Sequence, residues 1–266
     1  MPNPRLAGVE REDAWIPAPD GVLLHGWVLR PAAPPRGTCV FFHGNAENVS
    51  THVNAILWLV EAGYQVVAVD YRGFGRSGGE ADLAGTHADA LATLAWVFQR
   101  ADVDPDRVFV LGQSLGGAVA VYAVARSPHR KRVRLLIVDS APAGYRRIAR
   151  EKIARLILTW PFQHLLALGF DDRHSAERWI GKVSPVPVLL LHGGRDRIVP
   201  VRHARLLHEL APDPKGLWIV QDAGHIQALA HPPLREHLLE VLPDLLRGVV
   251  PPEAGERPSK RGAESP

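Results

Sequence analysis

Cysteine is almost absent from this chain of 266 residues, which contains one cysteine and one methionine. A single thiol cannot form an internal disulfide, and it excludes metal sites that are built from several cysteines. Cys39 lies in an apolar run at residues 38–42, where a buried and unreactive thiol is expected. Such cysteine usage is typical of a reducing compartment.

Long hydrophobic runs are also missing. No stretch approaches the ~18 uninterrupted apolar residues that a membrane span requires. Residues 1–15 lack the apolar core of a signal peptide. We therefore expect a cytoplasmic protein, and membrane contact is not the favoured interpretation.

The chain also lacks a large excess of either positive or negative charge. The chain has 31 Lys and Arg against 28 Asp and Glu, which gives a formal net charge of +3 and a pI near 9.2. No long basic run is available for phosphate binding, so we expect no nucleic-acid partner. A local basic cluster is interleaved with acidic and apolar residues, as on a solvated helix face, with an anion or membrane patch as the alternative. Its members are Arg146, Arg147, Arg150, Lys152 and Arg155.

What the sequence does contain is a series of short apolar runs. Two strand-like segments within residues 13–30 flank a turn at Pro19, Asp20 and Gly21, which predicts an N-terminal hairpin. Six further runs rich in β-branched residues follow, and their continuous apolar character is typical of parallel strands buried on both faces. These runs lie at residues 38–44, 65–71, 107–113, 133–140, 186–193 and 216–222.

Helical periodicity separates these runs, at about 50–62, 84–100, 115–126, 200–211 and 231–247. Strands that alternate with helices predict an α/β fold with a mostly parallel, doubly wound sheet. The length fits one domain, residues 1–248. An unusually long connection at about 143–184 predicts a small helical cap, with a dense apolar stretch from Leu156 to Phe170. The tail, 249–266, is expected to be disordered.

A GxSxG motif is the sharpest chemical signal. Ser114 lies between Gly112 and Gly116, directly after one predicted strand and directly before a predicted helix. A tight strand-to-helix turn with small neighbours exposes the serine hydroxyl at the sheet edge, as nucleophilic catalysis requires. The alternative is a serine that merely caps the helix.

A serine nucleophile needs a base and an acid that orients the base. Asp196 follows the strand at 186–193, and His225 follows the strand at 216–222, so both lie beyond the carboxyl ends of parallel strands. The chain order Ser114, Asp196, His225 accompanies a nucleophile elbow in this fold. Asp139, which ends the strand at 133–140, is the alternative acid, while Asp222 is expected to satisfy its own loop.

The oxyanion that forms during acyl transfer needs N–H donors. The Leu115 amide at the helix start and the Asn45 amide after the first parallel strand are the candidates, with Ala46 in reserve. His43 is expected to hold this loop rather than to react. The glycine-rich segment at 70–79 does not match a dinucleotide fingerprint, so we interpret it as structural, with Asp70 and Arg72 in loop hydrogen bonds.

These motifs together resemble a known family. HGNA at 43–46, DYRGFGRSGG at 70–79, GQSLGGAV at 112–119, HGGRDRIVP at 192–200 and AGH at 223–225 are similar to the serine hydrolases of the α/β-hydrolase superfamily. The most similar branch includes BEM46-like and serine aminopeptidase-like (S33-type) hydrolases. The resemblance implies the α/β-hydrolase fold, the triad Ser114, Asp196, His225, and an oxyanion hole at Asn45 and Leu115.

The predicted function is therefore hydrolysis of a carboxylic ester or thioester through an acyl-enzyme intermediate, with apolar acyl groups favoured. A small-molecule ester or acyl compound is the expected substrate, with no metal and no organic cofactor. An aminopeptidase or amidase on the same triad is one alternative, and a non-catalytic binding protein is another. The oligomeric state and the substrate-binding residues stay open.

Overall fold

The computed structural model describes residues 9–154, 169 and 171–249. Most of the apolar stretch expected in the cap, residues 155–168 and 170, therefore lies outside the described residues. Of the tail expected at 249–266, all but Val249 lies outside them as well.

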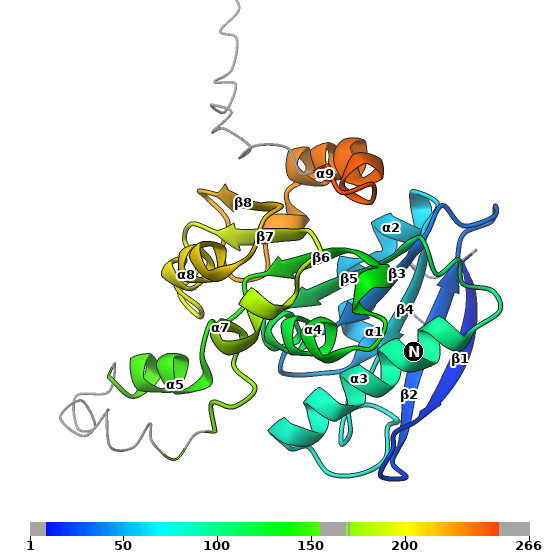
Figure 1. The fold of residues 1–266 in the computed structure, drawn as a ribbon, viewed down its shortest axis with the longest axis horizontal. Coiled ribbons are helices and arrows are strands. Elements are labelled where there is room, and N and C mark those ends of the chain that lie inside the picture. Colours follow the sequence, from blue (N-terminus) through cyan, green and yellow to red (C-terminus); the bar gives the residue numbers. More distant parts are fainter. Residues whose placement is uncertain (1–8, 155–168, 170, 250–266) are drawn as a thin grey trace, which may run out of the picture.

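A single sheet dominates the described part of the chain, with the strand order β1-β2-β4-β3-β5-β6-β7-β8 (Figure 1). β1 pairs antiparallel with β2 and β2 antiparallel with β4, whereas all other neighbours are parallel. The predicted α/β class with a mostly parallel sheet is confirmed. The strands are β1 (Glu10–Pro17), β2 (Leu23–Arg30), β3 (Thr38–Phe42), β4 (Gln65–Val69), β5 (Val108–Gln113), β6 (Val133–Asp139), β7 (Val188–Gly193) and β8 (Lys215–Val220).

The first two strands form a hairpin. The Gly21 N–H donates to the Ala18 carbonyl at 3.0 Å, and Gly21 has φ +86°, a conformation that glycine adopts without strain. β1 begins at Glu10, three residues before the segment predicted from apolar alternation. Its extra residues are charged, and Glu10 pairs across the ladder with Arg30 at 3.1 Å. A charged edge strand of this kind discourages pairing with another chain.

Helices occupy the connections between the parallel strands. The helix predicted at 50–62 is interrupted, because Ile56 has φ −126° and its fully buried side chain packs in the core between two short helices. The elements are α1 (Val49–His52), η2 (Val53–Ala55), α2 (Leu57–Glu61), α3 (Leu83–Gln99), α4 (Leu115–Arg126), η3 (Arg130–Arg132), α5 (Tyr145–Ile153), α7 (Ala176–Trp179), η5 (Ile180–Lys182), α8 (Arg202–Leu210), η6 (Ala228–Ala230) and α9 (Pro232–Leu245).

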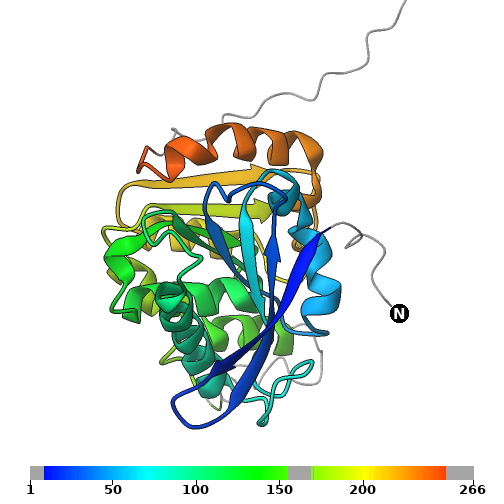
Figure 2. The same cartoon turned by 90° about the vertical axis from the view of Figure 1, so that its right-hand side faces the viewer.

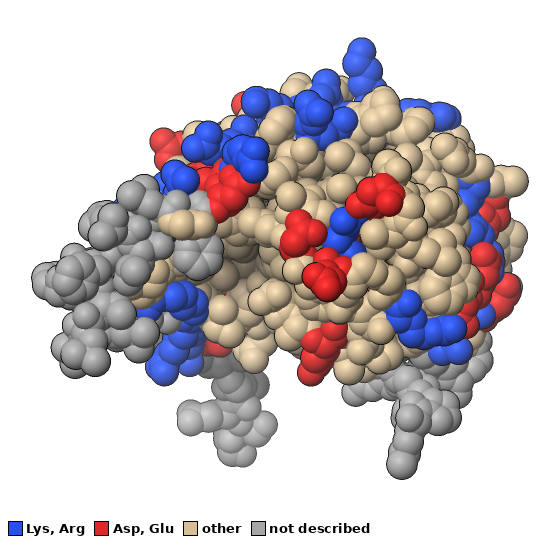
Figure 3. Space-filling view, turned by 90° about the horizontal axis from the view of Figure 1, so that it is seen from below, with Lys and Arg blue, Asp and Glu red and all other residues tan. Residues whose placement is uncertain are grey.

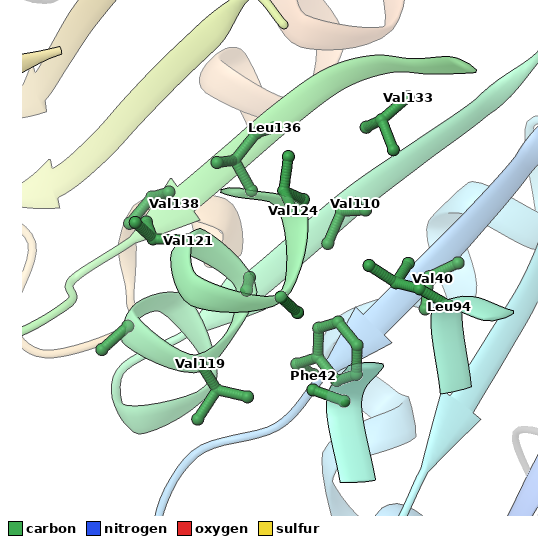
Figure 4. Packing of buried hydrophobic residues seen from close by; sticks show 14 of the residues in the cluster. Val40, Phe42, Leu94, Val110, Val119, Val121, Val124, Val133, Leu136 and Val138 are labelled. Atoms are coloured by element: carbon green, nitrogen blue, oxygen red, sulfur yellow. The ribbon is translucent and has the colours of Figure 1, made fainter. Parts of the chain in front are cut away.

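Two hydrophobic cores lie on opposite faces of the sheet. Successive residues of one strand alternate between them: Val40 and Phe42 enter the core under α3 and α4, and Phe41 enters the core under α1, α2 and α9. Figure 4 shows Phe42 and Leu94 in the first core, and Figure 2 shows α2 and α3 on opposite sides of the β1–β2 hairpin. Both faces are covered, which explains the continuous apolar runs of the parallel strands. Cys39 is fully buried in the second core, as predicted.

On the surface, basic and acidic side chains occur together. On the face in Figure 3 both kinds lie around a broad area of other residues. Four residues of the basic cluster lie on α5, where Arg147 pairs with Glu177 at 2.9 Å, as on a solvated helix face. Arg155 lies outside the described residues. Within residues 9–154, 169 and 171–249, no helix has the length and apolar character that crossing a membrane would take.

Candidate active site

Ser114 occupies a strained turn between β5 and α4. Its backbone has φ +54° and ψ −118°, a region that a residue with a side chain rarely adopts. Its N–H donates to the Asp139 carbonyl at 2.8 Å, which attaches the turn to β6. Non-glycine residues persist in such conformations only where the surrounding structure holds them. The turn has the form of a nucleophile elbow.

Three glycines make this turn possible. A Cβ on Gly112 would lie 2.2 Å from the Gly116 carbonyl oxygen, and a Cβ on Gly116 would lie 2.1 Å from the Phe42 oxygen. A Cβ on Gly117 would lie 2.7 Å from the Ala141 Cβ. Real Cβ atoms essentially never lie this close to other heavy atoms, so the start of α4 can pack this tightly against the neighbouring segments only because these residues are glycine.

The structure brings Ser114, Asp196 and His225 together from three separate loops. His225 Nε2 lies 2.9 Å from Ser114 Oγ, and His225 Nδ1 lies 2.7 Å from Asp196 Oδ2. Since the carboxylate accepts the Nδ1 proton, the neutral imidazole has a bare Nε2 that can accept the serine proton. These are the contacts required for base-assisted activation of a hydroxyl.

Asp196 is held by donors on both carboxylate oxygens. Oδ1 accepts the N–H groups of Ile198 at 2.8 Å and Val199 at 2.9 Å. Oδ2 faces His225 and, at 3.4 Å, His192 Nε2. Burial alone would raise the pKa of Asp196, but hydrogen bonds from His192, His225 and the Val199 amide outweigh burial and hold its pKa below the usual range.

Sequence reasoning missed His192. This fully buried histidine is the penultimate residue of β7 and donates from Nε2 to the Val199 carbonyl at 2.8 Å. Its contact with Asp196 therefore helps to orient the loop that carries the acid. The sequence signal that could have found it is its position near the carboxyl end of the strand that precedes Asp196, four residues before that aspartate.

The alternative acid, Asp139, has different partners. Gln113 Nε2 donates to Asp139 Oδ2 at 2.9 Å, and Ser140 Oγ donates to Asp139 Oδ1 at 2.9 Å. Burial raises the pKa of Asp139, and these two hydrogen bonds only partly offset the shift. Among the described contacts, Asp139 makes no hydrogen bond to His225. Asp222 lies on the surface and pairs with Arg195 at 2.7 Å rather than within its own loop.

The loop after β3 passes beside the serine. A Cβ on Gly44 would lie 3.5 Å from Ser114 Cβ. The Ala46 N–H donates to the Gly44 carbonyl at 3.2 Å, so this reserve donor is engaged. No hydrogen bond from the Asn45 or Leu115 amide to another described residue is found, so neither expected oxyanion donor is engaged in the described contacts.

His43 and its neighbours support this loop. The His43 ring donates from Nδ1 to the Gly44 carbonyl at 2.8 Å, and the Tyr71 hydroxyl donates to the His43 carbonyl at 3.0 Å. Asp70 Oδ1 accepts the Val49 N–H at 2.6 Å. In the same glycine-rich segment, the Arg72 guanidinium pairs with buried Asp89 at 2.7 Å. These contacts are structural, as expected for residues 70–79.

Backbone strain is concentrated around this site. Among the described residues, the non-glycine residues with positive φ are Glu47, Ser114, Ser140 and Ile226. Ser114 is the candidate nucleophile, Ile226 follows His225, and Ser140 follows Asp139. Glu47 lies in the loop between β3 and α1. Since each such residue costs about 1–3 kcal/mol, strain gathered at one edge of the sheet indicates a functional site.

The arrangement supplies a hydroxyl, an imidazole and a carboxylate in series. Over the described ranges, no three His, Cys, Asp or Glu side chains gather as metal ligands would. The Ser114, His225 and Asp196 side chains in series are the set that activation of a serine hydroxyl requires.

The chain is similar to proteins of the family that its motifs resemble. A family model described as serine aminopeptidase, S33, matches residues 33–172. The uncharacterized protein YfhR of Escherichia coli K12 is 36% identical over 223 residues, covering 82% of this chain and 75% of YfhR. Protein bem46 of Schizosaccharomyces pombe is 28% identical over 220 residues, covering 81% of this chain and 70% of bem46. The resemblance to BEM46-like proteins is confirmed.

Solved structures share the fold. The Pyrococcus furiosus esterase Pf2001 superimposes with a TM-score of 0.72 at 22% identity, covering 92% of this chain and 93% of the esterase. The α/β hydrolase GrgF from Penicillium has a TM-score of 0.70 at 19% identity, covering 90% and 98%. At these identities the likeness establishes the α/β-hydrolase fold.

Proposed function

Because the chain belongs to the serine aminopeptidase S33 family of α/β hydrolases, we propose that it is a serine hydrolase that cleaves carboxylic esters or thioesters through an acyl-enzyme on Ser114. One observation carries the proposal. His225 lies between Ser114 Oγ at 2.9 Å and Asp196 Oδ2 at 2.7 Å, so the chain can move a proton off the serine as the hydroxyl attacks.

The reaction has two halves. Ser114 Oγ loses its proton to His225 Nε2 and bonds to the acyl carbon, while the Leu115 and Asn45 amides stabilise the oxyanion. His225 then gives that proton to the leaving alcohol or thiol as its bond to the acyl carbon breaks. A water molecule next gives a proton to His225 Nε2 as its oxygen bonds to the acyl carbon. The bond between that carbon and Ser114 Oγ then breaks, the acid leaves, and His225 returns the proton to Ser114 Oγ.

Apolar side chains beside the site support an apolar acyl group. Leu115 follows Ser114 and is half-buried, and Ile226 follows His225 and is half-buried. Ile198, two residues after Asp196, is 50% exposed. Each member of the triad thus has a partly exposed apolar neighbour that an uncharged acyl chain could cover.

An aminopeptidase or amidase is the second candidate, because the matching family model is described as a serine aminopeptidase. The same triad would attack an amide, but recognition of a free α-amine needs an acidic anchor in the pocket. Aminoacyl p-nitroanilides with free and acetylated amines, assayed beside esters, distinguish the two activities. Turnover only of the free-amine substrates would replace the ester proposal.

The test compares the wild-type chain with Ser114→Ala. We expect the wild type to hydrolyse p-nitrophenyl or thioester substrates and to react with a fluorophosphonate, and Ser114→Ala to lose both while keeping its melting temperature. Ser127→Ala, which removes a buried hydroxyl at the far end of α4, is the matched control. Full labelling of Ser114→Ala would reject Ser114 as nucleophile. An inert, folded wild type would favour a binding protein.

A further inference from the structure

Three buried polar side chains form a continuous chain between the serine turn and the histidine loop. Gln113 Nε2 donates to Asp139 Oδ2 at 2.9 Å, and Ser140 Oγ donates to Asp139 Oδ1 at 2.9 Å. The Ile226 N–H in turn donates to Ser140 Oγ at 3.2 Å. Gln113, Asp139 and Ser140 are all fully buried.

The two ends of this chain adjoin the two reacting groups. Gln113 directly precedes Ser114, and Ile226 directly follows His225. Asp139 is the register partner of Gln113 across the parallel β5–β6 ladder, and its carbonyl also accepts the Ser114 N–H. The hydrogen bonds therefore join β5, β6 and the loop after β8 at the point where the Ser114–His225 distance is set.

Ser140 has an unusual backbone conformation, and its hydroxyl accepts the Ile226 N–H. Ser140 has φ +54°, and its N–H donates to the Leu191 carbonyl of β7 at 2.9 Å. Ile226, the residue that Ser140 holds, also has positive φ. Two residues with positive φ joined by one hydrogen bond indicate that the surrounding structure imposes this geometry, because non-glycine residues leave such conformations when nothing holds them.

We propose that Gln113, Asp139 and Ser140 are positioning residues that hold His225 Nε2 within hydrogen-bond distance of Ser114 Oγ. This inference rests on the proposed function. In the described hydrogen bonds, none of the three side chains is joined to Ser114 Oγ or to the His225 ring, so their effect passes through the position of His225. A displacement of about 1 Å at a reacting group can cost on the order of 100-fold in rate, and buried hydrogen bonds that link three elements resist such displacement.

The main experiment removes the Ser140 hydroxyl in two ways in the full chain. Ser140→Gly suits the positive φ, and Ser140→Ala keeps the Cβ. We expect kcat on a p-nitrophenyl ester to fall by roughly 10- to 100-fold in both, with KM nearly unchanged. The melting temperature of Ser140→Gly should be maintained, because glycine relieves the backbone strain. Ser127→Ala, the matched control, should retain wild-type kcat.

A second measurement separates positioning from a general structural role. In a His225→Ala background, Ser140→Gly should cause no further loss of the residual turnover, because the group that it positions is already gone. A purely structural serine would lower the activity of both backgrounds by the same factor.

Asp139 provides a conservative comparison. Gln113 Oε1 has no hydrogen-bond partner among the described residues. In Asp139→Asn, a flip of the Gln113 amide would let Oε1 accept from the new NH₂, and the network would survive. We expect Asp139→Asn to stay within a few-fold of wild type and Asp139→Leu to lose kcat as Ser140→Gly does.

The outcomes are distinguishable. If Ser140→Gly keeps kcat within about twofold, or loses it equally with and without His225, the positioning role is wrong. If Asp139→Leu keeps the kcat of the wild type, Asp139 is not one of the positioning residues. Retained turnover in Ser114→Ala, assayed alongside, would instead overturn the proposed function.

Discussion

Replacement of Asp196 by asparagine tests the triad at the level of single hydrogen bonds. Asp196 Oδ1 accepts two backbone N–H groups, from Ile198 and Val199, while Oδ2 faces His225 Nδ1. Asparagine has one carbonyl oxygen, and the two backbone donors should retain it, because an NH₂ facing them would leave three buried donors in contact. The NH₂ is therefore directed at His225.

The consequence for His225 is a change of tautomer. An NH₂ group donates to Nδ1, so the imidazole proton moves to Nε2, the atom that faces Ser114 Oγ at 2.9 Å. A protonated Nε2 cannot accept the serine proton. Such a tautomer error costs on the order of 10⁴-fold in kcat in a well-studied serine protease, or about 5 kcal/mol of transition-state stabilisation.

The assay is steady-state hydrolysis of a p-nitrophenyl ester, with Asp139→Asn measured as the matched control. We expect Asp196→Asn to lose about 10³- to 10⁴-fold in kcat, and both variants to stay folded by circular dichroism. A loss below about tenfold in Asp196→Asn, or a larger loss in Asp139→Asn, would refute the reasoning and assign the acid to Asp139.

The remaining predictions concern stability and substrate choice. Burial lowers the pKa of His87 to about 4, so the unfolded chain binds the proton first, and stability should fall as pH drops from about 6.5 toward 4. In urea unfolding, the free energy of unfolding of His87→Gln should fall with decreasing pH by about 1.4 kcal/mol per pH unit less than that of the wild type. Equal pH slopes in the two proteins would show that His87 is not the group responsible. Gly116→Ala should destabilise by about 1–3 kcal/mol or more, since its Cβ would meet the Phe42 carbonyl; an unchanged urea midpoint would show that the turn can relax. On p-nitrophenyl esters, kcat/KM should rise from acetyl to medium chains by up to ~0.8 kcal/mol per methylene, and a peak at acetyl would exclude an apolar acyl site.

The strands and the serine turn could be predicted because their signals are local. A continuous apolar run predicts a strand buried on both faces, and the glycines around Ser114 predict a turn that excludes side chains. The parallel order of the strands then places Asp196 and His225 at the same edge of the sheet as Ser114.

Other features depend on contacts between distant segments. The Ser140–Ile226 hydrogen bond joins residues 86 positions apart, and no local pattern distinguishes that serine from any other. Nothing in the local sequence distinguishes His192 from other residues of an apolar strand, and its contact with Asp196 depends on the conformation of the loop after β7. The break at Ile56 follows from packing two short helices on the sheet, which periodicity alone does not reveal.

The residues around Ser114 fall into two groups that should differ in their tolerance of substitution. Gly112, Gly116 and Gly117 leave no space for a single added carbon, so attempts to engineer this enzyme should leave that turn untouched. Leu115, Ile198 and Ile226 instead expose their side chains in part, and in the described contacts those side chains take no part in the hydrogen bonds that hold the triad. Under the proposed function, libraries varied at these three positions should change substrate preference while Ser114, His225 and Asp196 keep their hydrogen bonds.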